Sequence, residues 1–469
     1  MADKKELSEG KKLEESLFYK KENFFEVSSE EKIKAAYDYA EGYKKFLDES
    51  KTEREAVRAA TAYAESKGYS EYKFGDKLSA GDKKYYSNRG KSFIMFKVGS
   101  ENMAVNGIKI LASHIDSPRL DIKQVPLYED TGMAFLKTHY YGGIKKYQWT
   151  AMPLALHGIV VLESGEAVTV TVGEKDSDPV FYINDLLPHL SKEQITKPLA
   201  TAIDGETLNV LVGGYPFKDD DVKEKVKLTV LKKLNDTYGM KETDFISAEL
   251  CVVPAYKARD IGFDRALIGG YGHDDRVCSY PAMTALGESK DELSTVVVVL
   301  ADKEEIGSEG ATGMQCGIFS DLVDMLAASQ GVPASVVRAN SKCLSADVTA
   351  GFDPNFAGVF EKRNSSIVSC GTALCKFTGA GGKSGSSDAS AELVGYVRRI
   401  FEKANVNWQM AELGKVDAGG GGTVAKYIAK LNIDTIDIGV PVISMHAPYE
   451  VISKADLYST YEAFAAFIG

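Results

Sequence analysis

The sequence predicts an α/β protein in which a mixed, mostly parallel β-sheet is flanked by helices and the chain is interrupted by an inserted β-rich module. After residue 270, buried apolar strands alternate with helical patterns, which is typical of a parallel sheet. Between 125 and 265, short β-type runs separated by charged, turn-rich connections replace that pattern. The 469 residues also exceed one ordinary hydrophobic core, so two structural units are expected.

The N-terminal part is expected to contain a charged arm and two helices. Residues 1–27 are rich in lysine and glutamate, and a solvated arm or frayed helix is preferred to an arm that docks on a neighbouring subunit. Ser29 can cap the first helix, and a second helical stretch begins near Glu53 and ends at Gly68. Two strand patterns follow, at 92–98 and 107–113.

The insert and the C-terminal part differ in their elements. The insert contains the β-type runs GIVVLE, EAVTVTVG and AELCVVPAY. The C-terminal part contains a helix beginning in GHDDRV, a strand in STVVVVLAD, a strand-like run from 436 that ends in ISMH, and helices near 322–329, 389–404 and 455–467. We therefore expect a discontinuous main domain formed by 1–125 and 266–469, and an inserted domain formed by 126–265.

The composition is that of a globular protein, with 44% hydrophobic and 26% charged residues. A net charge of -11 argues against nucleic acid or an anionic membrane as the main partner, because phosphate binding needs clustered lysine and arginine. No apolar run approaches the ~20 residues of a membrane helix, and the N-terminus is too charged for a signal peptide. Six cysteines without a CxxC pair indicate free thiols and a cytoplasmic location.

Two of the six histidines are placed at the ends of strand-like runs. His114 follows the run GIKILAS, and His446 ends the run ISMH. Ligands of open α/β sheets gather at the carboxyl ends of strands, so both histidines are candidate metal ligands. Asp116, two residues after His114, is suited to orient that histidine. An ordinary hydrogen-bonded histidine is the alternative for each.

Carboxylates occupy similar positions. The segment Asp302–Glu305 directly follows VVVVLA, and buried acidic groups are costly unless they are paired or bind a metal. Adjacent glutamates point in different directions, so one can bind a metal while the other faces a water molecule and accepts its proton. Asp274 in GHDD and Asp347 in LSAD are further candidates. The structural alternatives are an acidic turn, a helix cap and a turn aspartate.

Together these residues predict a dinuclear metal site. Two ions about 3.5–4 Å apart need one bridging carboxylate and about two further ligands each. Nitrogen and oxygen ligands suit zinc, with cobalt or manganese as alternatives. The predicted ligands are His114, Asp274, Glu305, Asp347 and His446. HExxH and GxSxG are both absent, and the GKS at 382–384 lacks the first glycine of a P-loop, so competing chemistries are disfavoured.

Five motifs, in this order, resemble the aspartyl aminopeptidase (M18) family of metallopeptidases, and its bacterial branch in particular: SHIDSPRL, GHDDR, DKEEIGSEG, SADV and MHAPYE. The resemblance implies a zinc-peptidase fold with an inserted dimerisation domain and two metal ions per subunit. It also implies peptide substrates with a free N-terminus, and dimers assembled into a tetrahedral dodecamer.

The resemblance further implies a role for each residue of the site. Asp116 would lie behind His114, and Glu304 would be the general base. The metal ligands would be His114 and Asp347 for one ion, Glu305 and His446 for the other, and Asp274 as the bridge.

The substrate-facing positions follow the family pattern less closely. Eukaryotic relatives carry histidines where this chain has VTAGFDPN at 348–355, and KSG at 383–385 replaces an Arg-Tyr segment. Lys376 falls where a lysine contacts acidic substrates, with a surface lysine as the alternative, and His189 is a candidate to reach a neighbour's active site. A preference for acidic N-terminal residues and a preference for leucine-type residues both stay open. Two rival functions are the same scaffold acting as a carboxypeptidase or deacylase, and a non-catalytic cage or cargo protein.

Overall fold

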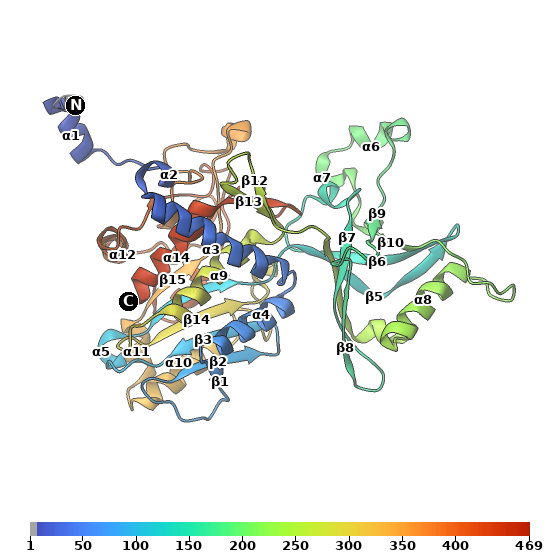
Figure 1. Cartoon of the computed structure of the whole chain (residues 1–469), viewed down its shortest axis with the longest axis horizontal. Helices are drawn as coiled ribbons and strands as arrows, with labels where there is room; N and C mark the ends of the chain where they lie inside the picture. Colours follow the sequence, from blue (N-terminus) through green and yellow to red (C-terminus); the bar gives the residue numbers. More distant parts are fainter. Residues whose placement is uncertain (1–6) are drawn as a thin grey trace.

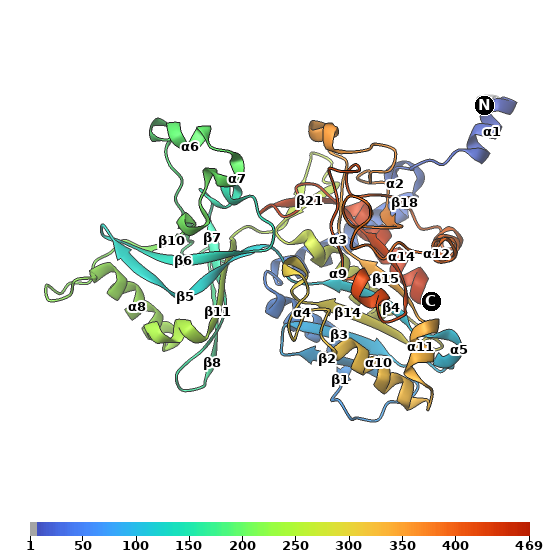
Figure 2. The same cartoon turned by 180° about the vertical axis from the view of Figure 1, so that it is seen from behind.

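The computed structural model describes residues 7–469, which form two lobes of unequal size (Figure 1). The larger lobe contains a nine-stranded sheet with the order β1-β2-β3-β14-β4-β15-β19-β17-β18. The smaller lobe contains a seven-stranded sheet with the order β8-β7-β11-β5-β6-β10-β9. Figure 2, the view from behind, shows the same separation of the two lobes.

The large sheet is mixed, with parallel strands at its centre. β14, β4, β15 and β19 are parallel, and β3 and β17 pair antiparallel with the outer two of these. The carboxyl ends of the four central strands therefore meet at one edge, and the predicted fold class is confirmed. The strands of this sheet are β1 (Ser70–Glu71), β2 (Lys83–Asn88), β3 (Ser92–Lys97), β4 (Lys109–His114), β14 (Val296–Ala301), β15 (Lys342–Ala346), β17 (Thr372–Cys375), β18 (Trp408–Met410) and β19 (Asp434–Gly439).

Helices cover both faces of this sheet. Val296, Val298 and Leu300 of β14 face one core, and Val297 and Val299 face the other, which explains why the strand is a continuous apolar run. The first core is covered by α3 (Glu30–Asp48), α4 (Glu53–Ser66), α9 (His273–Glu288), α12 (Ala391–Lys403) and α14 (Lys454–Ile468). The second is covered by α5 (Met103–Asn106), α10 (Ile318–Ser329), α11 (Ala334–Asn340) and α13 (Ala425–Ala429).

The first two long helices begin where the sequence predicts, the first of them at its predicted cap Ser29. The side chain of Ser29 accepts a hydrogen bond from the backbone of Lys32, and Thr52 forms a capping box with Glu55 at the start of α4. After α4 the chain turns at Gly68, whose φ of 81° lies in the left-handed region that glycine adopts without strain. The predicted limits of α4 are therefore confirmed.

The N-terminal arm combines an exposed and a packed part. No residue of α1 (Glu9–Leu17) is buried, and both views show this helix projecting from the larger lobe. In α2 (Phe24–Val27), however, Phe24 is fully buried against Ala36 and Ala455. The prediction of a solvated arm over 1–27 is therefore wrong at Phe24, because an aromatic side chain within the charged segment packs on the larger lobe. Residues 1–6 of that arm lie outside the described residues.

The smaller lobe packs its sheet around a separate core. Three predicted β-runs form β7 (Leu154–Val161), β8 (Ala167–Val172) and β11 (Ala248–Pro254), and the other strands are β5 (Arg119–Asp130), β6 (Met133–Tyr141), β9 (Tyr182–Ile183) and β10 (Val210–Gly213). This lobe also contains α6 (Lys192–Thr196), α7 (Leu199–Ala202) and the 14-residue α8 (Lys225–Tyr238). The sequence did not predict α8, because the charged run before it has the pattern of a loop.

A small three-stranded sheet pairs the strand that precedes α9 with a strand near the C-terminus. It is formed by β12 (Arg259–Ile261), β13 (Leu267–Gly270) and β21 (Glu450–Ser453). β16 (Thr349–Ala350) and β20 (Pro441–Val442) form a separate parallel pair. Because β13 leads into α9 and pairs with β21, this sheet brings the start of α9 close to the turn that precedes β21. Within residues 7–469, no helix has both the length and the apolar character needed to cross a membrane.

Candidate metal centre

The five predicted ligands converge at the carboxyl edge of the parallel strands. His114 is the last residue of β4, Glu305 lies in the turn after β14, and Asp347 follows β15. Asp274 lies in the first turn of α9. The helix is preceded by Gly272, whose φ of 76° lies in the left-handed region that favours glycine. His446 lies between β20 and β21.

His446 does not end a strand as predicted. β20 ends at Val442, and His446 lies in a turn with a φ of 64°. The carboxylate of Glu450 holds this turn, since it accepts hydrogen bonds from the backbone N–H of His446 (2.8 Å) and of Asp274 (3.1 Å). Glu450 ends the motif MHAPYE without a role predicted from the sequence, although an acidic residue at the start of the apolar run VIS indicates a buried position.

Asp274 lies between the two histidines. Nε2 of His114 is 3.1 Å from Oδ1 of Asp274, and Nε2 of His446 is 3.2 Å from Oδ2 of the same carboxylate. Each histidine faces a second carboxylate at 3.6 Å, Asp347 beside His114 and Glu305 beside His446. The arrangement therefore has two histidine–carboxylate pairs joined by one carboxylate that uses both oxygens.

The hydrogen bonds of the imidazole rings of His114 and His446 determine which ring nitrogen can bind a metal ion. Nδ1 of His114 donates to the carbonyl of Asp116 at 3.1 Å, and Nδ1 of His446 donates to the carbonyl of Gly143 at 2.8 Å. With Nδ1 engaged by a carbonyl, Nε2 is the nitrogen of each ring that faces the carboxylates, and its lone pair becomes available when the ring is neutral. This is the state in which a histidine binds a metal ion.

The buried carboxylates of this cluster lack sufficient protein partners. Among residues 7–469, Oδ1 of Asp274 and Oε1 of Glu305 are buried without a hydrogen-bond donor. Burial, reinforced by repulsion from Asp274, raises the pKa of Glu305 well above its usual value. Burial also raises the pKa of Asp347. Two imidazole nitrogens and three crowded carboxylates are a donor set that divalent cations of the zinc type would satisfy.

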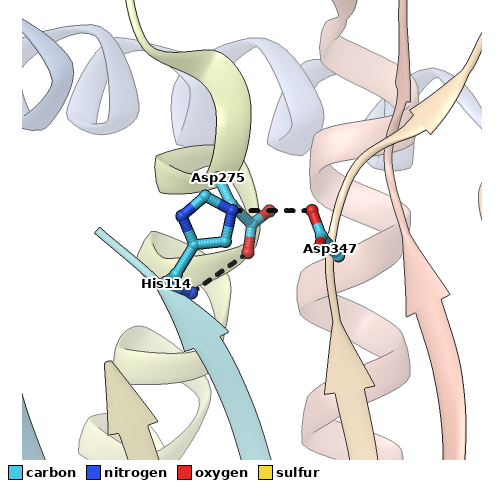
Figure 3. A group of neighbouring side chains, drawn as sticks. All are labelled: His114, Asp275 and Asp347. Atoms are coloured by element: carbon cyan, nitrogen blue, oxygen red, sulfur yellow. Dashed lines mark hydrogen bonds and ion pairs between the residues drawn. The ribbon is translucent and has the colours of Figure 1, made fainter. Parts of the chain in front are cut away.

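Asp275 is a further carboxylate beside His114, with no role predicted from the sequence (Figure 3). Its Oδ2 accepts a hydrogen bond from the backbone N–H of His114 at 3.4 Å. Two sets of ligand atoms lie close enough to hold an ion, one of His114, Asp275 and Asp347 and the other of His114, Asp274 and Glu305. Asp274 is the better bridging candidate, because each of its oxygens faces a different histidine. Asp275 is less suited, because its Oδ2 already accepts a hydrogen bond from the backbone N–H of His114.

Glu304 lies at the edge of the cluster. Its Oε2 is 4.0 Å from Nε2 of His114, and its side chain is 17% exposed. Burial, followed by repulsion from Asp347, raises its pKa to about 8. The carboxylate of Asp116 accepts the backbone N–H groups of Glu304 (3.1 Å) and Glu305 (3.2 Å), and so fixes both glutamates relative to His114.

Comparison with known proteins identifies the family of this chain. The family model described as Aminopeptidase I zinc metalloprotease (M18) matches residues 46–468. The chain belongs to the M18 family. A probable M18 family aminopeptidase 1 from Clostridium acetobutylicum is 48% identical over 454 residues, which are 95% of this chain and 97% of the relative. This M18 protein is therefore a metalloaminopeptidase, and the predicted family and enzyme class are confirmed.

Solved structures of M18 enzymes have the same fold. The M18 aminopeptidase of Thermotoga maritima has a TM-score of 0.91 and 40% identity, with 96% of this chain and 99% of that chain covered. Aminopeptidase I of Clostridium acetobutylicum has a TM-score of 0.90 and 45% identity, with coverages of 97% and 100%.

A cavity of about 400 Å³ adjoins the metal centre of this M18 enzyme. Its walls include Glu304, Glu305, Asp347 and His446, together with Val348, Leu413, Met445, Asp437 and the glycines 420–422. In the described part of the chain, the residues that line it include no lysine or arginine. Lys376 is not part of the lining, and its Nζ forms an ion pair with Asp388 at 2.8 Å. His189 is exposed in the 3-10 turn Pro188–Leu190 of the smaller lobe.

Proposed function

We propose that this M18 aminopeptidase removes N-terminal residues from peptides at a dinuclear metal site. The observation that carries the proposal is the position of Asp274 between two histidines, each of which faces a second carboxylate. The proposed ligands are His114 and Asp347 for one ion, Glu305 and His446 for the other, and Asp274 as the bridge. Zinc is the proposed ion, with cobalt or manganese as replacements.

Glu304 is the proposed general base. When bound, the metal ions would polarise the scissile carbonyl and lower the pKa of water. Glu304 accepts the proton of the attacking water and returns it to the leaving amine. A partly exposed carboxylate beside the ligands suits this role, since it reaches the cavity while its backbone is held by Asp116. The free α-amino group of the substrate binds near the ligand carboxylates.

The cavity favours uncharged N-terminal side chains over acidic ones. An acidic side chain would need a cation, and Lys376 is already paired with Asp388 outside the lining. The described residues of the lining instead offer apolar side chains such as Val348 and Leu413, and no lysine or arginine that could pair with aspartate or glutamate. A preference for acidic residues would require Lys376 to leave Asp388 and turn into the cavity.

The smaller lobe is the proposed dimerisation domain, corresponding to the insert at 126–265 between 1–125 and 266–469. Between 180 and 199 it exposes an unusual number of large apolar side chains: Val180, Tyr182, Leu186, Leu187, Leu190, Ile195 and Leu199. The mApe1 protein of S. cerevisiae, 21% identical with a TM-score of 0.75, has been solved as a dodecamer. We propose that dimers of this chain likewise build a tetrahedral dodecamer, in which His189 reaches a neighbour's active site.

The cysteines support the proposed cytoplasmic location. All six lie in the described residues as free thiols, and only Cys316 is not buried. Such thiols persist in a reducing compartment.

A panel of short peptides tests the proposed function. With zinc, cobalt or manganese supplied, we expect cleavage of Leu- and Met-peptides at least about tenfold faster than of Asp- and Glu-peptides, measured as kcat/KM. N-acetylated versions should resist cleavage, because an aminopeptidase needs the free amine. Cleavage of blocked peptides would instead support a carboxypeptidase or deacylase, and no hydrolysis with any metal would support a non-catalytic protein.

A further inference from the structure

The end of β6 extends from the smaller lobe into the metal centre. Tyr141, the last residue of β6, donates a hydrogen bond from its hydroxyl to Oδ2 of Asp116 at 2.8 Å. Two residues later, the carbonyl of Gly143 accepts the hydrogen bond from Nδ1 of His446. Gly142 lies between them, and a Cβ there would come within 3.2 Å of Oε2 of a glutamate ligand, Glu305. This segment therefore contacts both sides of the cluster.

Asp116 is the point at which this segment acts on the ligands. Its carboxylate is fully buried and contacts four groups. Oδ1 lies 3.3 Å from Nδ1 of His114 and accepts the N–H of Glu304, while Oδ2 accepts the N–H of Glu305 and the hydroxyl of Tyr141. The smaller lobe thus contributes one hydrogen bond, from the hydroxyl of Tyr141, to the carboxylate of Asp116. That carboxylate in turn orients His114 and the loop that carries Glu304 and Glu305.

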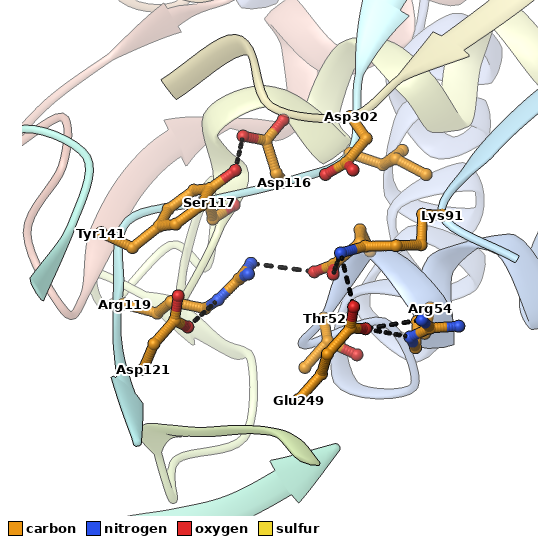
Figure 4. Close-up of polar contacts among 12 residues, drawn as sticks. Thr52, Arg54, Lys91, Asp116, Ser117, Arg119, Asp121, Tyr141, Glu249 and Asp302 are labelled. Atoms are coloured by element: carbon orange, nitrogen blue, oxygen red, sulfur yellow. Dashed lines mark hydrogen bonds and ion pairs between the residues drawn. The ribbon is translucent and has the colours of Figure 1, made fainter. Parts of the chain in front are cut away.

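Tyr141 is itself held in place by a buried ion pair (Figure 4). The guanidinium of Arg119 lies 4.1 Å from the centre of the tyrosine ring, a cation–π contact. Nη1 of Arg119 pairs with Glu53 at 2.8 Å, and its Nε pairs with Asp121 at 2.7 Å. Glu53 is the first residue of α4, so the ring is fixed between an element of the larger lobe and a strand of the smaller one.

We infer that Tyr141 is a positioning residue of the metal centre, which acts through Asp116 on His114 and on the Glu304–Glu305 loop. The inference rests on the proposed dinuclear site. Loss of the hydroxyl alone would keep the ring against Arg119 but remove one of the four groups that hold the buried Asp116 carboxylate, which would then be less firmly oriented. Groups that orient a metal ligand in this way typically contribute about 10–100-fold to metal affinity or activity.

The test compares Tyr141→Phe with the neighbouring control Tyr140→Phe in the full-length protein. Tyr140 is 45% exposed and its hydroxyl has no hydrogen-bond partner within residues 7–469. Zinc affinity is measured by competition with a chelator, and folding is checked by thermal melting of the metal-free proteins. We expect Tyr141→Phe to bind zinc about 10–100-fold more weakly with an unchanged metal-free melting temperature, and Tyr140→Phe to behave like the wild type.

A double-variant cycle with Asp116→Asn shows whether the effect passes through Asp116. Because that change already disrupts the shared carboxylate, we expect Tyr141→Phe to weaken zinc binding much less in the Asp116→Asn background than in the wild type. Wild-type zinc affinity in Tyr141→Phe, or the same loss in both backgrounds, would overturn the inference. A wild-type protein that binds no zinc would instead refute the proposed function on which the inference rests.

Discussion

Glu304 and Glu305 are adjacent in the sequence but have different surroundings. The side chain of Glu305 is 4% exposed and faces His446, whereas that of Glu304 is 17% exposed and lies beside His114. Adjacency alone could not assign one as ligand and the other as base. The difference in burial and in partner now supports the assignment that the family resemblance implied.

Replacement of Glu304 by glutamine tests its role as the base. The amide keeps the shape of the side chain but cannot accept a proton, so we expect Glu304→Gln to retain two metal ions and to lose about 10²–10⁴-fold in kcat. Metal content and peptide hydrolysis are measured on the same sample. Glu309→Gln, an exposed position on the same loop, is the matched control and should remain fully active. A fully active Glu304→Gln would remove this residue from the mechanism.

At the scale of single residues, the candidate metal ligands are easier to predict from the sequence than the residues that hold those ligands in place. Histidines and carboxylates at strand ends are visible as motifs, and the structure brings His114, Asp274, Glu305, Asp347 and His446 together. Tyr141 carries no such motif, and it reaches the site because β6 leads from the smaller lobe to the cluster, which a single sequence does not reveal. Glu450 is the last residue of the motif MHAPYE, but the sequence alone does not show that its carboxylate binds the backbone N–H groups of His446 and Asp274.

Among the structural elements, α4 is joined to the smaller lobe by a buried histidine. His157 of β7 lies 2.8 Å from Glu55 of α4 and 3.0 Å from Glu174, which also pairs with Lys51 at 2.7 Å. Burial lowers the pKa of His157, but the hydrogen bonds and charges of Glu174 and Glu55 outweigh it, so the pKa lies above its usual value.

This junction predicts a pH-dependent contribution to stability. A histidine whose pKa is raised in the folded state stabilises it below the unfolded pKa of about 6.5, and that contribution is lost as the pH rises through the folded value. We expect the melting temperature of the wild type to fall more steeply between pH 6 and 9 than that of His157→Gln. His139→Gln, at an exposed histidine of β6, should follow the wild type. If the melting temperatures of all three proteins changed with pH in the same way, His157 would not be the source of this pH-dependent stability.

The predictions of individual elements succeeded where one physical pattern dominated. The valine run of β14 and the capped start of α3 were recognised because burial on two faces and side-chain capping leave clear local signals. The sequence does not predict α8, because the charged run before it has the pattern of a loop, and it predicts the end of a strand at His446, where the structure has a turn. This turn is held by the carboxylate of Glu450, a contact with the backbone of both His446 and Asp274 that leaves no local signal.

At the scale of the whole molecule, the exposed apolar segment 180–199 predicts self-association. We expect the wild-type chain of 50.9 kDa to sediment as a dodecamer. Leu187→Ser combined with Leu190→Ser should shift it to smaller species, because both side chains are exposed in the monomer (48% and 67%). Val125→Ser, exposed on β5 outside this segment, is the control. Light scattering measures the masses, and a monomeric wild type would contradict the proposed assembly.

The overall architecture was predictable because hydrophobic pattern and strand–helix alternation determine it. The mixed sheet with a parallel centre follows from the alternation after residue 270, whereas the sheet of the smaller lobe begins with β5 at Arg119, before the change of pattern at 125. The contact between the two lobes could not be predicted from the sequence. Arg119, Glu53 and Tyr141 meet there only because β5, β6 and the start of α4 are brought together by the complete fold.

The number of zinc ions bound per chain tests the central claim most directly. At one fixed free zinc concentration, we expect two ions in the wild type, one in Asp347→Ala, one in Glu305→Ala and none in Asp274→Ala, because the last variant removes the ligand shared by both ions. Elemental analysis after equilibrium dialysis gives these numbers. One ion in the wild type, or two ions retained by Asp274→Ala, would contradict a dinuclear centre bridged by Asp274.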